Sequence, residues 1–171
     1  MPESSSHPGK KKEEDEEQGQ DEEYISARIS QVGHADKLGL EGVLVLLSDD
    51  GREFPMRAFS GEVAQHISRF QTGDKLSIPT IYNMVEEIAV LQDLLLIEVR
   101  VYQSGSVLRA NLYFKKRDSE MVLRNYRASD AIALAAYYDV PIKVRKSLFE
   151  LEDVHRQERE RLSHQGHNES I

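Results

Sequence analysis

RNYRASDAIALAAYYDVPIKV, residues 124–144, combines the signals for a strand, a helix and a second strand. Strong helix formers fill its middle, and Ser129 and Asp130 stand where a side-chain cap and a carboxylate favour the start of a helix. Asp139-Val140-Pro141 ends that helix, because proline disfavours helical backbone in the residue before it. We therefore expect a strand, a short apolar helix and a second strand. The pattern leaves open whether Ser129 and Asp130 only cap the helix or also carry chemistry.

Three segments that alternate apolar and polar residues precede this stretch, and the last of them overlaps its first residues. They span residues 95–103, 107–116 and 121–128, and turn residues separate them. Such a pattern predicts an antiparallel meander with one buried face. The opposite face combines arginines with tyrosines, which can contact phosphates and stack on unpaired bases. We take Arg100, Arg109, Tyr113 and Arg124 as candidate nucleic-acid-binding residues, although an outer sheet face of this kind also suits a structural role or a subunit interface.

Turns and helices fill the part of the chain before the meander. Asp49-Asp50-Gly51 predicts a hairpin turn, and residues 60–73 predict a helix with Ser60 as its N-cap. Residues 78–92 predict a second helix with one apolar stripe, formed by Ile81, Met84, Val85, Ile88 and Leu91. Because helices and strands do not strictly alternate, we expect an α+β fold: an antiparallel or mixed β-sheet meander with packed helices in a single domain.

The acidic residues are concentrated at the two ends of the chain. The 171 residues carry a net charge of −8, but residues 1–23 hold nine acids and three lysines and residues 150–171 hold six acids and three arginines. Residues 24–149 are therefore nearly neutral. We expect a disordered acidic tail over residues 1–23, a folded domain over 24–151 and a polar helical or disordered tail over 152–171.

Composition also limits the chemistry and the location of the protein. The chain has no cysteine, which excludes disulfides, thiol nucleophiles and cysteine-based zinc sites. No apolar run is long enough to span a membrane, and the N-terminal residues lack the apolar core of a signal peptide. We therefore expect a cytoplasmic protein without membrane contact.

Residues 126–144, YRASDAIALAAYYDVPIKV, resemble the hallmark segment of the bifunctional nuclease domain family. In that segment Arg-Pro-Ser-Asp-Ala-Ile-Ala-Leu-Ala precedes a Val-Pro-Ile strand. Residues 42–67 are similar to the family's earlier hairpin and helix, so the resemblance covers roughly residues 42–151. It implies an α+β fold, homo-oligomers, and cleavage of DNA or RNA with little sequence preference. Carried onto this chain, it makes Arg127, Ser129 and Asp130 the candidate catalytic residues.

The chain also departs from the family pattern. Ala128 replaces the hallmark proline, and Ile81-Tyr82-Asn83 stands where the family usually has Thr-His-Asp, so a phenol and an amide replace the natural general base and metal ligand. The sequence leaves the cofactor unknown: a nuclease of this kind could use Mg²⁺ or Mn²⁺, but the sequence identifies no set of metal ligands. The alternative function is a non-catalytic oligomeric scaffold that binds a protein or small ligand at the Arg127–Asp130 corner.

Overall fold

A single seven-stranded sheet organises the computed structural model, which describes residues 23–165. The strand order is β3-β2-β1-β7-β4-β5-β6, and every pair is antiparallel except β4 and β7. The strands are β1 (Tyr24–His34), β2 (Glu41–Ser48), β3 (Glu53–Ser60), β4 (Leu95–Ser104), β5 (Val107–Lys116), β6 (Ser119–Arg127) and β7 (Ile142–Arg145). The helices are α1 (Gly61–Gln71), α2 (Ile81–Leu91), α3 (Ala128–Tyr138) and α4 (Lys146–Gln165). The expected α+β single domain with a mixed sheet is confirmed.

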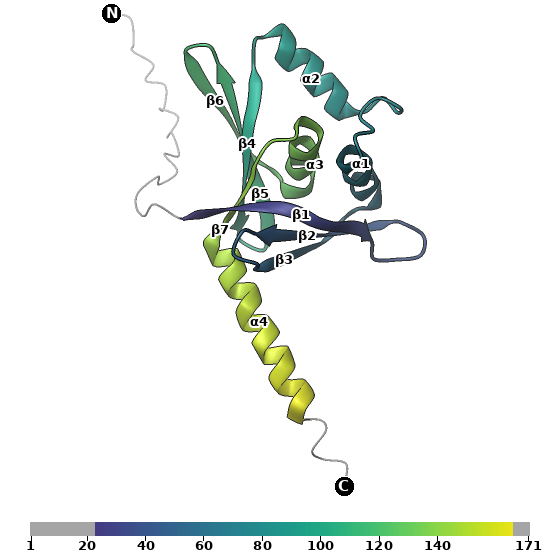
Figure 1. Ribbon diagram of the computed structural model, residues 1–171, viewed down its shortest axis with the longest axis vertical. Helices are drawn as coiled ribbons and strands as arrows, with labels where there is room; N and C mark the ends of the chain where they lie inside the picture. The colour runs from purple at the N-terminus through teal and green to yellow at the C-terminus, as the bar shows by residue number, and fades with distance from the viewer. Residues whose placement is uncertain (1–22, 166–171) are drawn as a thin grey trace, which may run out of the picture.

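The core lies between two groups of strands that cross one another. In Figure 1, β1, β2 and β3 run across the view and β4, β5 and β6 run along it, with α1 and α3 packed in the space between them. Eight of the eleven residues of α3 are buried, which explains why its sequence is so rich in alanine. Its small side chains let the helix pack closely on α1 and on β4, β5 and β6. The hallmark stretch is thus the centre of the fold.

The meander of β4, β5 and β6 has the expected pairing, and β7 connects it to the other strands. After α3, β7 pairs parallel with β4 and antiparallel with β1. A bulge in β4 between Leu96 and Glu98 shifts the buried set to Leu96, Val99 and Val101. A second bulge in β6 surrounds Asn125, which has a positive φ of 65°. This second bulge determines which side chains point toward α3.

The apolar stripe of α2 faces outward. Thr80 and Asn83 form a capping box that stabilises the start of the helix. Among the side chains of α2, only Tyr82 and Ala89 are buried. Ile81, Met84, Ile88 and Leu91 are all exposed, with Leu91 at 79%. The helix is tethered at its two ends and packs on α3 through few residues. Most of the apolar stripe predicted for α2 is therefore an exposed surface of the folded chain, and only part of the helix contacts the core.

The chain ends in a long polar helix. Leu148 and Phe149 anchor the first turns of α4 in the core, and the rest of the helix projects from the body (Figure 1). None of the helices in residues 23–165 is long and apolar enough to cross a membrane. The acidic segment expected to be disordered, residues 1–23, lies almost wholly outside the described residues, as do the last six residues.

Candidate functional site

The start of α3 forms a sharp corner directly after a strand. β6 ends at Arg127 and α3 begins at Ala128, so no loop residues separate them. Arg127 itself is the N-cap, in extended conformation, and the structure shows no side-chain hydrogen bond that caps this helix. The expectation that Ser129 caps the helix is wrong, because the direct strand-to-helix connection moves the helix start two residues earlier. Ser129 instead occupies the second helical position and is 4% exposed.

An ion pair spans the corner. The Arg127 Nε lies 3.3 Å from the Asp130 Oδ2, and both side chains are about half exposed. The one-turn separation of the two residues places them on the same face of the helix start. Arg127 and Asp130 therefore remain accessible to a ligand while they hold each other in position.

Arg127 and Ser129 line a cavity of about 900 Å³. The cavity is enclosed by β3, the turn between β4 and β5, the start of β5 and the start of α3. Two further arginines line it, Arg57 from β3 and Arg109 from β5, and neither forms an ion pair within the described part of the chain. The single acidic residue in the lining is Glu41, whose Oε1 accepts a hydrogen bond from the Ala58 N–H at 3.1 Å. We call this space the arginine cavity.

Two helix N-termini border the arginine cavity. Ser60, which caps α1 by accepting a hydrogen bond from the Glu62 N–H at 3.3 Å, lines it together with Ala128 and Ser129 of α3. The first N–H groups of a helix lack partners within the helix and carry partial positive charge. The lining of the arginine cavity thus includes three arginines and the positive ends of two helices. This arrangement favours an anion, and a phosphate group fits both the guanidinium geometry and the amide dipoles.

Asp130 faces a different cavity on the other side of the corner. This second space has a volume of about 400 Å³ and lies between α2, α3, β5 and β6. Its lining is apolar except for Tyr82, Tyr126 and Asp130. Strict alternation along β6 would place Tyr126 on the outer sheet face with Arg124, but the bulge at Asn125 turns Tyr126 toward this cavity. We call this space the apolar cavity.

Tyr82 and Asn83, two of the residues that depart from the resembled pattern, both have structural roles. Tyr82 is buried against Phe70 at 5.5 Å between ring centroids, and burial, with the nearby Asp130 charge, raises the pKa of its hydroxyl above the ordinary value. Asn83 accepts a hydrogen bond from the Thr80 N–H at 2.9 Å and donates to the Lys75 carbonyl and the Tyr137 hydroxyl, each at 3.0 Å. Neither side chain can act as a general base at neutral pH, because the phenol is held protonated and an amide has no basic nitrogen.

The outer face of the meander holds a compact cluster of paired charges. Arg100 donates to Glu98 at 2.6 Å and lies over the ring of Tyr113 at 4.3 Å, while Lys143 contacts the same carboxylate at 2.8 Å. Arg100 and Tyr113 are therefore engaged with each other and with Glu98. Arg109 is at the far end of this face, where it reaches the arginine cavity, and Arg124 is exposed on the neighbouring strand.

Residues 23–165 contain no cluster of three histidine, aspartate or glutamate side chains that could hold a metal ion. Glu62 and His66 approach at 3.6 Å, one turn apart on α1, without a third ligand. At the corner, Asp130 is the one carboxylate that Arg127 contacts. The residues present do not form a resident site for Mg²⁺ or Mn²⁺, since such ions are normally held by several oxygen ligands.

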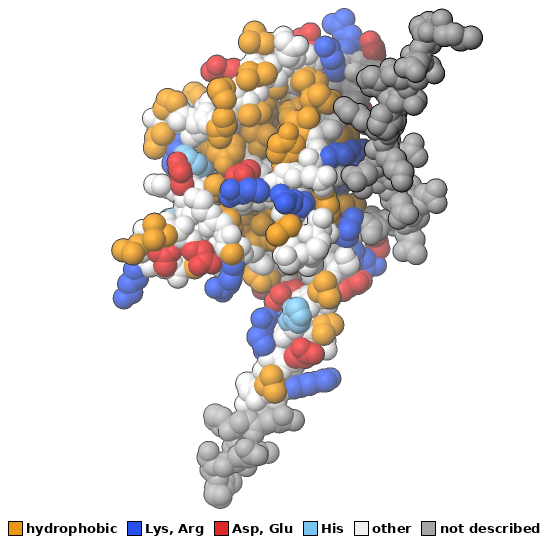
Figure 2. Space-filling view, turned by 180° about the vertical axis from the view of Figure 1, so that it is seen from behind, with side chains coloured by type: hydrophobic (Ala, Val, Ile, Leu, Met, Phe, Trp, Pro, Cys, Tyr) orange, Lys and Arg blue, Asp and Glu red, His pale blue; other side chains and the backbone are white. Residues whose placement is uncertain are grey.

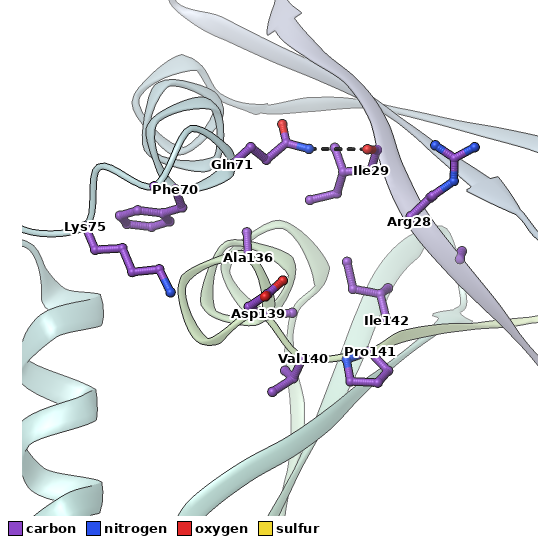
Figure 3. Close-up of a pocket in the computed structure, with 13 residues that line it drawn as sticks. Arg28, Ile29, Phe70, Gln71, Lys75, Ala136, Asp139, Val140, Pro141 and Ile142 are labelled. Carbon is purple, nitrogen blue, oxygen red and sulfur yellow. Dashed lines mark hydrogen bonds between the residues drawn. The ribbon is translucent and has the colours of Figure 1, made fainter.

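A third cavity of about 650 Å³ lies at the opposite end of α3. Figure 3 shows it between β1, the end of α1 and the segment that enters β7, with Lys75 and Asp139 on one side and Arg28 on the other. Gln71 crosses this space to donate a hydrogen bond to the Ile29 carbonyl at 3.2 Å. Its charged groups lie apart around the rim (Figure 3).

The part of the chain that holds these cavities matches a known protein family. The model of the bifunctional nuclease domain matches residues 44–157, two thirds of the chain. The chain belongs to the bifunctional nuclease domain family. No individual curated protein matches it.

The match to the bifunctional nuclease domain includes every residue of the arginine cavity that carries positive charge. Arg109, Arg127 and Ser129 were candidates from the sequence, but Arg57 was not. Arg57 lies on the strand at one end of the sheet, and Arg109 and Arg127 lie on the last two strands at the other end. Only the crossing of the two strand groups brings them together, so no local sequence signal could have indicated Arg57.

Proposed function

We propose that this bifunctional nuclease domain protein hydrolyses phosphodiester bonds in DNA or RNA with little sequence preference. The observation that carries the proposal is the arginine cavity at the α3 corner, which Arg57, Arg109 and Arg127 line together with two helix N-termini. Family membership supports the same reading. Contacts to the phosphate backbone carry no sequence information, which agrees with a broad substrate range.

Each residue of the corner has a distinct part in the proposed reaction. The arginines and the first amides of α3 bind the phosphate and neutralise the charge that builds up as the attacking oxygen approaches. Water attacks the phosphorus and releases its proton to the solvent while the bond to the leaving oxygen breaks, and Asp130 holds Arg127 in position for this step through their ion pair. Ser129 lines the phosphate side of the corner, where its hydroxyl would donate a hydrogen bond to a phosphate oxygen. We assign no step to a metal ion, because the corner supplies a single carboxylate.

Cleavage of labelled oligonucleotides tests this proposal. Single-stranded DNA, double-stranded DNA and RNA would be incubated with the purified protein, with and without Mg²⁺ or Mn²⁺. We expect products with the unmodified chain and loss of product with Asp130→Ala, while Asp118→Ala, on the exposed turn between β5 and β6, should cleave normally. Equal rates in the two variants would overturn the role of Asp130, and the absence of cleavage under every condition would overturn the nuclease.

A second function is favoured by the positions of Tyr82 and Asn83. Both residues are engaged in packing or hydrogen bonds, and neither offers a base or a metal ligand. A scaffold that binds a protein or small ligand at the Arg127–Asp130 corner without catalysis needs only the two cavities. Binding of an oligonucleotide without cleavage would support this alternative.

We also propose that the protein forms homo-oligomers through the exposed stripe of α2. Five large apolar side chains on this helix are exposed, and Leu76, Ile78 and Leu95 extend the exposed apolar surface at its two ends. Contiguous surfaces of this kind mark interaction sites. Light scattering should show a multimer for the unmodified chain and a smaller species for Ile88→Glu. A monomer at all concentrations would contradict the proposal.

A further inference from the structure

The apolar cavity adjoins the arginine cavity across the Arg127–Asp130 ion pair. Arg127 lines one space and Asp130 the other, and their side chains are 3.3 Å apart. Figure 2 shows hydrophobic side chains gathered around a hollow over α2 and β6, with Lys and Arg side chains beside it. The volume of about 400 Å³ falls in the range of roughly 300–1,000 Å³ that is typical of small-molecule sites.

The walls of the apolar cavity suit a flat aromatic ring. Tyr126, which is half exposed, stands at the mouth, and the side chains of Leu112 and Leu123 form part of the walls. An unpaired base placed there would bury its apolar faces and stack on a tyrosine, as bases do on aromatic platforms in proteins that bind single strands. The two cavities lie on the two sides of the Arg127–Asp130 ion pair, and a nucleotide likewise carries its base on one side and its phosphate on the other.

We propose that the apolar cavity is a nucleobase subsite that prefers guanine. Asp130 is the one ionisable acid in its lining, and an ionised carboxylate only accepts hydrogen bonds. Guanine presents two adjacent donors, the ring N1–H and the N2 amino group, on its Watson–Crick edge. Adenine and cytosine place a ring acceptor beside their amino group, and uracil flanks its ring N–H with two carbonyl oxygens. Guanine is therefore the base that satisfies Asp130 with two donors and brings no acceptor to face it.

This inference rests on the proposed function and refines it. A phosphate in the arginine cavity and a base in the apolar cavity would make cleavage selective at one nucleotide position and indifferent at the others. Arg127 would hold Asp130 in place for the base while it contacts the phosphate. A second copy of the chain is the competing occupant of the hollow, since α2 forms one of its walls.

The test uses nucleosides, which contain no phosphodiester bond, so its result does not depend on cleavage. Binding of guanosine, adenosine, cytidine and uridine to the full chain would be measured by calorimetry and by saturation-transfer NMR. We expect guanosine to bind at least about tenfold more tightly than adenosine, the discrimination typical of one bidentate contact. Asp130→Asn should remove this preference and favour adenosine, because an amide both accepts from and donates to the adenine edge.

Two further variants separate the cavity from the rest of the surface. Leu123→Trp should fill the cavity and abolish nucleoside binding, whereas Val122→Trp, on the opposite face of the same strand, should bind as the unmodified chain does. If Leu123→Trp fails to fold, Tyr126→Ala removes the stacking ring from the mouth and should weaken guanosine binding. Absence of nucleoside binding, equal affinity for all four nucleosides, or the same affinity in Asp130→Asn would overturn the subsite. Nucleoside binding that appears only after Ile88→Glu separates the subunits would show that the oligomer covers the hollow, and would overturn the subsite in the assembled protein.

Discussion

Two neighbouring tyrosines of α3 differ in whether their hydroxyls are hydrogen bonded. Tyr137 is buried, accepts a hydrogen bond from Asn83 at 3.0 Å and donates one to Glu86, and burial together with Glu86 raises its pKa to about 12. The hydroxyl of Tyr138 is buried as well, but it has no partner within the described residues. The tyrosine hydroxyl therefore stabilises the fold at position 137 and destabilises it at position 138.

We expect Tyr137→Phe to lower the free energy of unfolding by about 1–3 kcal/mol, because it leaves Asn83 and Glu86 without their partner. Tyr138→Phe is the matched control, and it should be neutral or slightly stabilising since it removes an unsatisfied polar group. Urea denaturation of the two variants measures both effects. A larger loss in Tyr138→Phe than in Tyr137→Phe would contradict the assignment of this network.

At the scale of single residues, the sequence indicated which residues gather at the α3 corner, but not which cavity each side chain faces. The hallmark motif indicated Arg127, Ser129 and Asp130, and the structure places the three at one corner with Arg127 paired to Asp130. It did not show that Asp130 faces one cavity while Ser129 faces another, because the turn from strand to helix depends on where β6 ends. Ser129 as N-cap was wrong for the same reason.

At the scale of elements, Glu98 joins β4 to β7. Its carboxylate accepts from Arg100 at 2.6 Å and from Lys143 at 2.8 Å. Burial alone would raise the pKa of Glu98, but these two hydrogen-bonding partners outweigh it and hold the pKa below its ordinary value of 4.5. A lowered pKa in the fold contributes stability that is fully present above pH 4.5 and is lost as the pH falls through the lower value.

Glu98→Gln should therefore reduce stability at neutral pH, and its difference from the unmodified chain should shrink as the pH falls below 4.5. Thermal unfolding followed across this pH range measures the difference. Glu120→Gln, at the exposed start of β6, serves as the control and should follow the unmodified chain. A difference that grows in acid would have the wrong sign for this explanation.

Periodicity predicted the elements well and their exposure less well. The meander and the hairpin before it follow from alternation and from turn residues, and both are present. The stripe on α2 was correctly identified as apolar, but a stripe does not reveal whether its partner belongs to the same chain. Bulges at Leu96–Glu98 and around Asn125 shifted side chains between faces, and a strict period of two cannot anticipate such insertions.

At the scale of the whole molecule, charge is divided between the ends and the domain. Residues 1–23 carry nine acids and three lysines, while the arginine cavity carries three arginines. Removal of residues 1–22 should therefore raise the affinity for a single-stranded oligonucleotide at low salt, because an acidic segment competes with phosphate for the same positive charge. Fluorescence anisotropy measures this change, and an affinity that is unchanged by the deletion would show that the segment does not compete.

The arginine cavity itself is a property of the whole molecule, since β3 and β5 are brought together only by the crossing of the two strand groups. Sequence reasoning predicted the fold class and the family, because these depend on local patterns. It could not predict a role for Arg57, because the other two arginines that line the cavity come from strands about 50 and 70 positions later in the chain.

The salt dependence of oligonucleotide binding is the decisive measurement for a phosphate site at the α3 corner. The affinity for a single-stranded oligonucleotide would be measured over a series of salt concentrations for the unmodified chain, Arg57→Ala, Arg109→Ala and the control Arg117→Ala, which lies on the exposed turn between β5 and β6. Removal of an arginine that binds one phosphate should reduce the slope of log affinity against log salt by about 0.7. We expect this reduction for Arg57→Ala and for Arg109→Ala and an unchanged slope for Arg117→Ala. Identical slopes in all four proteins would contradict a phosphate site at the α3 corner.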